Sequence, residues 1–94
     1  MCNQVTISGK IVKIYPVRET PSGTSVVTFV IQHNSRQIEA EVSREVKCRL
    51  FCILVGNIEF KISNTQDNLV QVTGFLSQNA KSEIVLHVKE IIYR

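Results

Sequence analysis

The side chains best suited to metal binding or nucleophilic catalysis in this sequence are two histidines, His33 and His87, and three cysteines, Cys2, Cys48 and Cys52. Zinc could use the last two thiolates with the imidazoles, but their four-residue spacing lies in a strand-like run and not in a knuckle turn. An odd number of cysteines without an export signal also argues against a disulfide framework. We therefore expect structural histidines, reduced and buried cysteines, and no metal site.

Recognisable catalytic motifs are missing as well. No serine or cysteine lies in a nucleophile motif such as G-x-S-x-G, and no glycine-rich phosphate loop occurs. Three carboxylates, Glu39, Glu41 and Glu45, crowd one polar segment, and a solvated loop explains them better than an acid/base pair does. The sequence thus predicts a binding protein that is not an enzyme and uses no cofactor.

Positive charge offers a different chemistry, the binding of phosphate groups. The 94 residues contain 11 Lys and Arg against 8 Asp and Glu, with a net charge of +3 and a pI near 8.9. This mild excess is compatible with a polyanionic partner. Whether it forms a binding surface depends on the elements that carry the basic residues.

Strand patterns dominate those elements. Strand-like runs cover residues 4–14, 25–33, 44–55, 69–76 and 83–93. In the first three, apolar and polar side chains roughly alternate with the two-residue period of half-buried strands. Gly9 lies inside the first run and indicates a bulge or bend. The segment Thr20-Pro21-Ser22-Gly23 predicts a turn followed by a hairpin.

Two segments between the strands lack this clear alternation. Residues 34–42 are polar and predict a long surface loop, with pairing of its tip as a hairpin extension as the alternative. Residues 56–68 predict a connector, and the two-residue spacing of Ile58, Phe60 and Ile62 favours an extended form over a short helix.

Five strands without an amphipathic helix of ten or more residues predict a small barrel, because a sandwich usually needs more strands. We expect an all-β, five-stranded OB-fold barrel with Greek-key order, formed by one domain over residues 1–94. The alternation predicts a core made by Val5, Ile7, Phe29, Ile31, Val46, Cys48, Leu50, Val72 and Leu86.

The sequence also bears on location in the cell. No apolar run approaches the roughly 20 residues needed to span a bilayer. The start, Met1-Cys2-Asn3-Gln4, lacks the basic and apolar regions of a signal peptide. We therefore expect a cytoplasmic protein.

An OB barrel predicts where basic residues would meet a ligand. Single-stranded nucleic acid lies across the second and third strands and is clasped by the loops between strands 1 and 2 and between strands 4 and 5. The basic residues on those elements, which we predict to bind nucleic acid, are Arg18, Arg36, Arg44, Lys47, Arg49 and Lys81. The alternative is that these are only solubility charges on exposed strands.

Six short segments carry a resemblance to a known family. They are Ile7-Ser8-Gly9, Thr20-Pro21-Ser22-Gly23, Phe29-Val30-Ile31-Gln32-His33, Arg44 with Cys48, Val72-Thr73-Gly74-Phe75-Leu76, and Val85-Leu86-His87. In their joint order and spacing the chain resembles primosomal replication protein N (PriB), a single-stranded-DNA-binding OB-fold family of bacterial replication restart.

The resemblance implies a homodimer that binds single-stranded DNA, contacts the restart helicase PriA and passes the complex to the loader protein DnaT. Arg18 and Arg44 stand where the family has basic residues. Elsewhere the chain departs from the family pattern: Lys47 and Val42 stand where the family can place aromatic residues, and Asn34 where it can place an arginine that Arg36 could replace from two positions away.

The loop at residues 78–83 departs most, because related proteins can carry a longer, lysine-rich loop where this chain has only Lys81. Loss of one stacking aromatic costs about 1–3 kcal/mol per base. We therefore expect weak binding through phosphate contacts made mainly by Arg18, Arg44 and Lys47, tolerant of sequence and steeply dependent on salt.

Two other classes of protein are compatible with the sequence. A barrel with a decayed DNA face could act as an adaptor that holds the helicase and the loader together, which the poor aromatic content would suit. An RNA-binding OB domain of the cold-shock kind ranks third, because it needs aromatics clustered on strands 2 and 3, where only Phe51 is placed to face outward.

Overall fold

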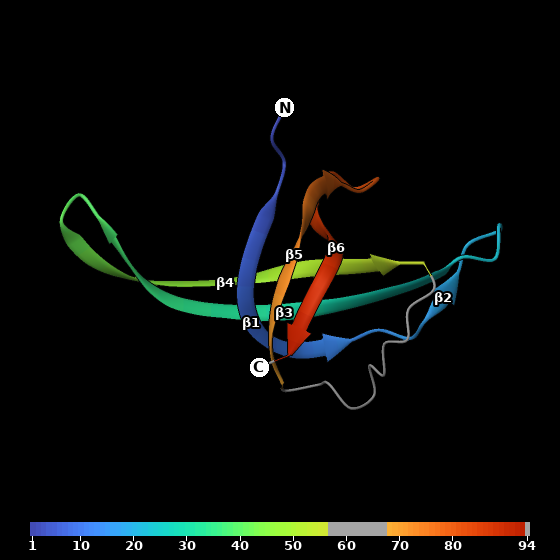
Figure 1. Ribbon diagram of the computed structural model, residues 1–94, viewed down its shortest axis with the longest axis horizontal. Coiled ribbons are helices and arrows are strands. Elements are labelled where there is room, and N and C mark those ends of the chain that lie inside the picture. The colour runs from blue at the N-terminus through green and yellow to red at the C-terminus, as the bar shows by residue number, and fades with distance from the viewer. Residues whose placement is uncertain (57–67, 94) are drawn as a thin grey trace.

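The computed structural model describes residues 1–56 and 68–93 and contains no helix over those residues. Its strands are β1 (Val5–Ile14), β2 (Arg18–Glu19), β3 (Ser25–Glu39), β4 (Val42–Val55), β5 (Leu69–Gln78) and β6 (Ile84–Tyr93). The five long strands lie at the five predicted strand runs, with β3 and β4 longer than predicted, and β2 is a two-residue addition (Figure 1).

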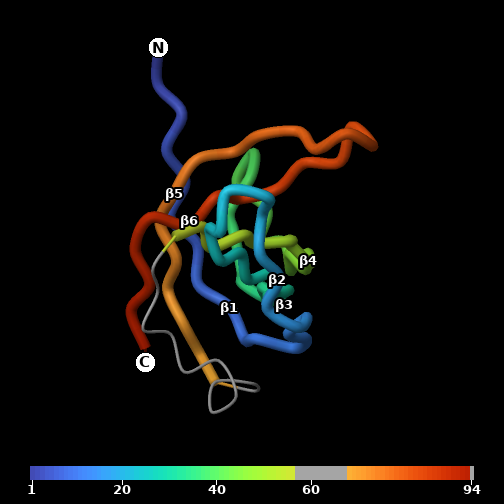
Figure 2. Tube along the Cα trace, turned by 90° about the vertical axis from the view of Figure 1, so that its right-hand side faces the viewer, coloured from blue at the N-terminus to red at the C-terminus, as the bar shows by residue number. Residues whose placement is uncertain are grey.

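The strands form one sheet that closes on itself. The order is β1-β5-β6-β4-β3-β2, and a further pairing of β1 with β3 joins the two sides into a five-stranded barrel. Neighbouring strands are antiparallel except for β4 and β6, which pair in parallel over three residues. Viewed along the longest axis, β1, β5 and β6 curve around β3 and β4 (Figure 2). This closure confirms the predicted OB-fold barrel.

Strand β1 belongs to both sides of the barrel, and it changes partner at Lys10, which pairs with β5 and with β3. Gly9 precedes that point because a Cβ there would lie 2.8 Å from the backbone oxygen of Gln32. The only irregularity in the pairing with β3 falls later, between Ile11 and Lys13. The glycine therefore permits the close approach of two strands and is not itself a bulge.

The turn predicted at Thr20–Gly23 closes the small hairpin of β2 with the start of β3. The amide of Gly23 donates to the carbonyl of Thr20 over 2.8 Å, and Gly23 has a φ of 84°. A positive φ is what glycine allows at this turn position. The hairpin places Arg18 opposite Val26, at the edge of the β3 surface.

Strands β3 and β4 form a hairpin that is longer than expected. Their pairing is continuous out to Glu39 opposite Val42, so the loop predicted over residues 34–42 is wrong and the hairpin extension is confirmed. Ala40 and Glu41 form the turn with φ of 50° and 66°, the two positive values of a tight hairpin turn. The far end of this hairpin, green in Figure 1, projects away from the crossing strands β1, β5 and β6.

The core lies where β3 and β4 cross the other strands. Of the nine predicted members, Phe29, Ile31, Val72 and Leu86 are buried, and Val5, Ile7 and Leu50 pack at the margin. The buried residues that the prediction omitted include Ile11, Val27, Val70 and Cys52.

Two predicted core residues are corrected by the structure. Cys48 is exposed and Val46 is only half-buried. Both lie on the core-facing side of β4, but the pairing of β1 with β3 ends at Gln32, opposite Arg49. Beyond that pair the hairpin has no second layer to cover it. Cys2 is exposed as well, so of the three cysteines only Cys52 is buried.

Two further points concern the rest of the chain. The predicted extended connector with Ile58, Phe60 and Ile62 lies outside the described residues. Among residues 1–56 and 68–93, no helix is long and apolar enough to cross a membrane.

Candidate nucleic-acid interface

The outer face of the β3–β4 hairpin carries three of the six predicted basic residues. Residues directly opposite one another in an antiparallel pair point to the same face. The outward pairs, from the tip toward the barrel, are Arg36 with Glu45, Asn34 with Lys47, Gln32 with Arg49, and Val30 with Phe51. Arg44 pairs with Gln37 one residue out of phase, so it points to the opposite face and does not join this row.

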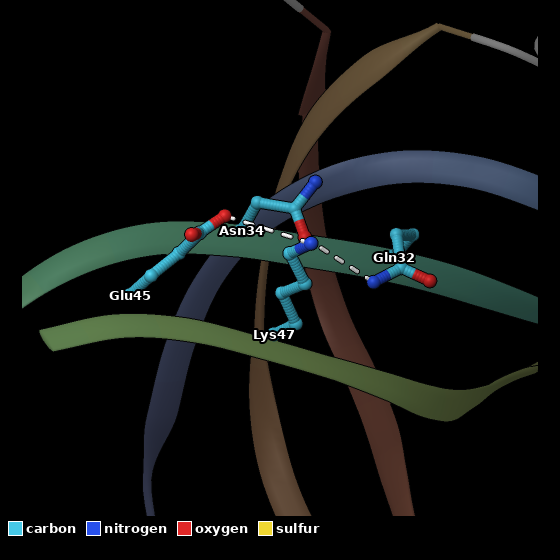
Figure 3. A network of polar contacts seen from close by, with 4 residues as sticks. All are labelled: Gln32, Asn34, Glu45 and Lys47. Carbon is cyan, nitrogen blue, oxygen red and sulfur yellow. Dashed lines mark hydrogen bonds and ion pairs between the residues drawn. The ribbon is translucent and has the colours of Figure 1, made fainter.

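Polar side chains link this row into a network (Figure 3). The Lys47 ammonium lies 3.6 Å from the Glu45 carboxylate, and Gln32 Nε2 donates to Asn34 Oδ1 over 3.3 Å. Arg49 Nε donates to Gln32 Oε1 over 2.8 Å. Lys47 and Glu45 are largely exposed, with side-chain exposures of 66% and 58%, so water and salt weaken their attraction. A phosphate group can therefore compete for Lys47.

The two basic residues nearer the tip have partners of their own. Arg44 Nε lies 3.5 Å from the Glu39 carboxylate, and Arg36 Nη1 donates to Ser43 Oγ over 3.4 Å. Arg44 faces away from the cationic row, so we place it outside the site. This differs from our expectation that it makes one of the main phosphate contacts.

A groove of about 540 Å³ lies on the outer face of the barrel, at the barrel end of the same hairpin surface. Its lining comes from the segment after β1, from β2, β3 and β4, and from the β5–β6 turn. The residues are Tyr15, Pro16, Arg18, Thr28, Phe51, Lys81 and Glu83. These are the elements on which an OB fold binds oligonucleotides.

The groove contains a pair of aromatic rings. Tyr15 and Phe51 lie with centroids 6.4 Å apart and planes inclined by 28°, and Phe51 is 40% exposed. The Lys13 ammonium lies 4.7 Å from the Tyr15 centroid, within the range of a cation–π contact. Aromatic faces of this kind accept stacked bases of any sequence.

Two cations line the same groove from segments far apart in the sequence. Arg18 comes from β2 and Lys81 from the β5–β6 turn, and within the described residues neither has an ion-pair partner. A groove with two aromatic rings and two cations without ion-pair partners among those residues suits single-stranded nucleic acid, whose bases can stack on the rings while its phosphates meet the cations. Arg18 and Lys81 thus share a groove with two aromatic rings, which a surface of phosphate contacts alone would not have.

The β5–β6 turn is short but well ordered by hydrogen bonds. Asn79 Oδ1 accepts from the backbone amides of Lys81 and Glu83 over 2.9 and 3.0 Å, and Asn79 Nδ2 donates to the Glu83 carboxylate over 3.1 Å. The turn thus presents one cation and one anion at the groove. The negative charge of Glu83 partly cancels the positive charge of Lys81, which the prediction from basic residues alone did not consider.

Only one member of the aromatic pair could be assigned to this face from the sequence. Alternation placed Phe51 on the outer face, but Tyr15 follows the last residue of β1 and has no strand period to assign its direction. What positions it is a backbone bond, from the amide of Tyr15 to the carbonyl of Thr28 over 2.9 Å. Such a contact between segments 13 positions apart is not visible in a sequence pattern.

His33 and the buried cysteine have structural environments. His33 bonds through Nδ1 to the Ser8 carbonyl over 2.6 Å and through Nε2 to Ser35 Oγ over 2.7 Å. Burial raises the pKa of the Cys52 thiol from 9.0 to about 12, because the thiolate would lose its hydration. Over the described residues, no three His, Cys, Asp or Glu side chains gather as metal ligands would.

Comparison with known proteins agrees with this fold. A family model described as another single-strand binding protein family matches residues 3–90. The structure of PriB from Ralstonia solanacearum superposes with a TM-score of 0.88 at 19% identity, covering 100% of this chain and 99% of that one. The single-stranded DNA binding protein from Thermus aquaticus gives 0.79 at 23% identity, covering 99% and 50%. Fold and family model together define an OB-fold protein of the single-strand binding class.

Curated relatives narrow this class. The replication restart protein PriB of Erwinia tasmaniensis is 33% identical over 95 residues, covering 95% of this chain and 90% of its own length. That of Vibrio cholerae is 31% identical over 97 residues, covering 97% of each. The chain belongs to the PriB family of replication restart proteins.

Proposed function

We propose that this protein binds single-stranded DNA during bacterial replication restart, as an accessory factor to the restart helicase. The observation that carries the proposal is a groove lined by the paired rings of Tyr15 and Phe51 and by Arg18 and Lys81. Family membership supports the same function. A decayed DNA face, which the adaptor alternative requires, is not favoured by a groove of this composition.

The binding mechanism follows from the arrangement of rings and charges. Bases stack on Tyr15 and Phe51, while their phosphates lie against Arg18 and Lys81. The strand then follows the outer face of the hairpin, where Lys47, Arg49 and Arg36 supply further cations. Stacking on the rings does not depend on base identity, so the site binds single strands with little sequence preference.

The charges set the salt dependence. Four cations lie along the groove and the near part of the hairpin: Arg18, Lys81, Arg49 and Lys47. For single strands, log K falls with log salt at about 0.7 per phosphate contact, which gives a slope of about −2.8 for four contacts. A fourfold rise in salt should then weaken binding about fifty-fold.

The decisive experiment is a titration of fluorescently labelled oligo-dT at about 50 and 200 mM salt. We expect saturable binding with the slope given above, and weaker binding of a duplex of the same length, because paired bases cannot stack on the groove rings. Oligo-U in the same assay distinguishes DNA from RNA preference. Absence of saturable binding at low salt, or equal affinity for the duplex, would refute the proposal and make the adaptor function the better one.

The family resemblance extends the proposal to protein partners. We propose a homodimer that contacts PriA and hands its complex to DnaT. An unpaired strand edge is a common site of two-fold association, and the far part of β4, beyond its three-residue pairing with β6, has such an edge among the described residues. Light scattering that returned a mass near 10.6 kDa across the micromolar range would contradict dimerisation.

A further inference from the structure

A row of half-buried side chains leads out of the groove and around the barrel. Thr28 of β3, which lines the groove, pairs with Ile53 of β4. Ile53 pairs with His87 of β6, and His87 pairs with Phe75 of β5. Paired residues share a face, so the outer surface is continuous from the groove to the β5–β6 sheet. Each of these four side chains is partly exposed.

The row ends in a second aromatic pair. The rings of Phe75 and His87 lie nearly parallel, at an angle of 7°, with centroids 4.9 Å apart. The Lys89 ammonium lies 5.9 Å from the Phe75 centroid. Rings of Phe and His are both common platforms for unpaired bases, and an adjacent ammonium supplies the charge for a phosphate.

A local irregularity of the sheet produces this geometry. Thr73 pairs with Glu90 and Gly74 with Val88, so Lys89 is the extra residue of a bulge and points outward together with Glu90. The bulge needs Gly74, because a Cβ there would collide with the backbone oxygen of His87. Bulges of this kind often redirect a side chain near a binding site.

A hollow of about 250 Å³ adjoins the pair. Phe75 and Lys89 line it together with Asn3, whose side-chain amide exchanges two hydrogen bonds of 2.9 Å with the backbone of Leu76. Glu90 also lines the hollow, and its negative charge leaves Lys89 as the one charged group among the described lining residues that attracts a phosphate. The hollow is therefore lined by Asn3, which its hydrogen bonds hold in place, by the ring of Phe75 and by the cation Lys89.

We propose that Phe75, His87 and Lys89 form a second contact for the same single strand of DNA, which leaves the groove across Ile53 and stacks on this pair. This inference rests on the proposed function of the groove. The chemical class of ligand is a nucleobase with its neighbouring phosphate. The site extends the length of DNA bound by one barrel and does not replace the groove.

The register sets how much DNA is required. Neighbouring strands lie about 4.8 Å apart, and Phe75 is three strands from Thr28, a path of about 14 Å. At the 3.4 Å spacing of a stacked strand, this corresponds to about four nucleotides, and to fewer if the strand is extended. Oligonucleotides of about four residues should fill the groove alone, whereas those of about eight or more should also reach the second pair.

The test is a length series of labelled oligo-dT, from about 4 to 16 nucleotides, against the wild-type protein and the Phe75→Leu and His87→Gln variants. Both variants keep side chains of similar bulk in the strand. We expect unchanged affinity for the shortest oligonucleotide and a loss of about 5- to 150-fold for the longer ones. Lys89→Gln should lower the salt slope for long oligonucleotides by about 0.7 and leave that of short ones unchanged.

Matched controls keep this test separate from the groove. Ile92→Ala removes an exposed apolar side chain of β6 away from the row, and Arg44→Gln removes one charge on the opposite face of the hairpin; neither should change the length series. Identical length curves for wild type and variants would overturn the second contact while the groove still binds. If these variants changed the oligomeric mass of the protein but not its DNA binding, the second DNA contact would be overturned, and the surface would instead be a contact between two copies of the chain. Failure of even short oligonucleotides to bind would instead refute the groove.

Discussion

Replacement of Phe51 by leucine separates stacking from charge in the groove. Phe51 is 40% exposed, and its ring centroid lies 6.4 Å from that of Tyr15. Leucine keeps an apolar side chain at this position but removes the aromatic ring on which a base would stack. Stacking of one base is worth about 1–3 kcal/mol by side-chain truncation, equivalent to a loss of affinity of about 5- to 150-fold. The variant carries the same charge, so the salt slope should not change.

The assay is fluorescence anisotropy with a short oligo-dT at several salt concentrations, alongside a thermal melt of each protein. Lys81→Gln is the complementary variant, because it should lower the slope by about 0.7 with the rings intact. Val55→Ala, an exposed apolar residue of the same strand outside the groove, is the control. Wild-type affinity in Phe51→Leu, or a changed salt slope, would show that Phe51 is not a stacking platform.

Other predictions follow from single residues. Lys47→Ala should weaken the binding of oligo-dT and oligo-dA equally and lower the salt slope by about 0.7, whereas Lys47→Trp should tighten binding and reduce its salt sensitivity. Glu45→Gln should also tighten binding, because it removes the carboxylate that pairs with Lys47. Unchanged titrations of all three variants would exclude the hairpin from the site. A thiol reagent at neutral pH should modify two cysteines in the native protein and the third, Cys52, only after denaturation, because burial raises its pKa to about 12; three fast-reacting thiols would disprove this. The same shift should make the free energy of unfolding fall as pH rises from 9.0 toward 12, since only the unfolded chain releases that proton, and a flat profile in chemical denaturation would contradict it. Gly74→Ala should cost about 3 kcal/mol or more and lower the melting temperature by at least about 10 °C, because its Cβ would meet the His87 carbonyl; a wild-type melt would show that the strands can separate without penalty.

The part of the site that lies on the hairpin could be predicted from the sequence. Alternation assigns a side chain to one face of its strand, so Lys47, Arg49 and Phe51 were correctly placed together. The same alternation points Arg44 to the opposite face of the strand. Arg44 was nevertheless included in the predicted site, because that prediction considered only which strand carries each basic residue. Tyr15 lies outside the strand period, and its place beside Phe51 depends on a backbone contact with β3.

The sequence by itself determined the five long strands, the turn before Gly23 and the in-or-out direction of most side chains, because these depend on neighbours one to four residues away. Only the tertiary structure decided how far the second layer extends along the hairpin. Cys48 has the same phase as the buried Cys52, yet it is exposed because β1 no longer covers β3 at its level. The meeting of Arg18 with Lys81 at one groove was decided in the same way, since closure of the barrel unites segments more than 60 positions apart.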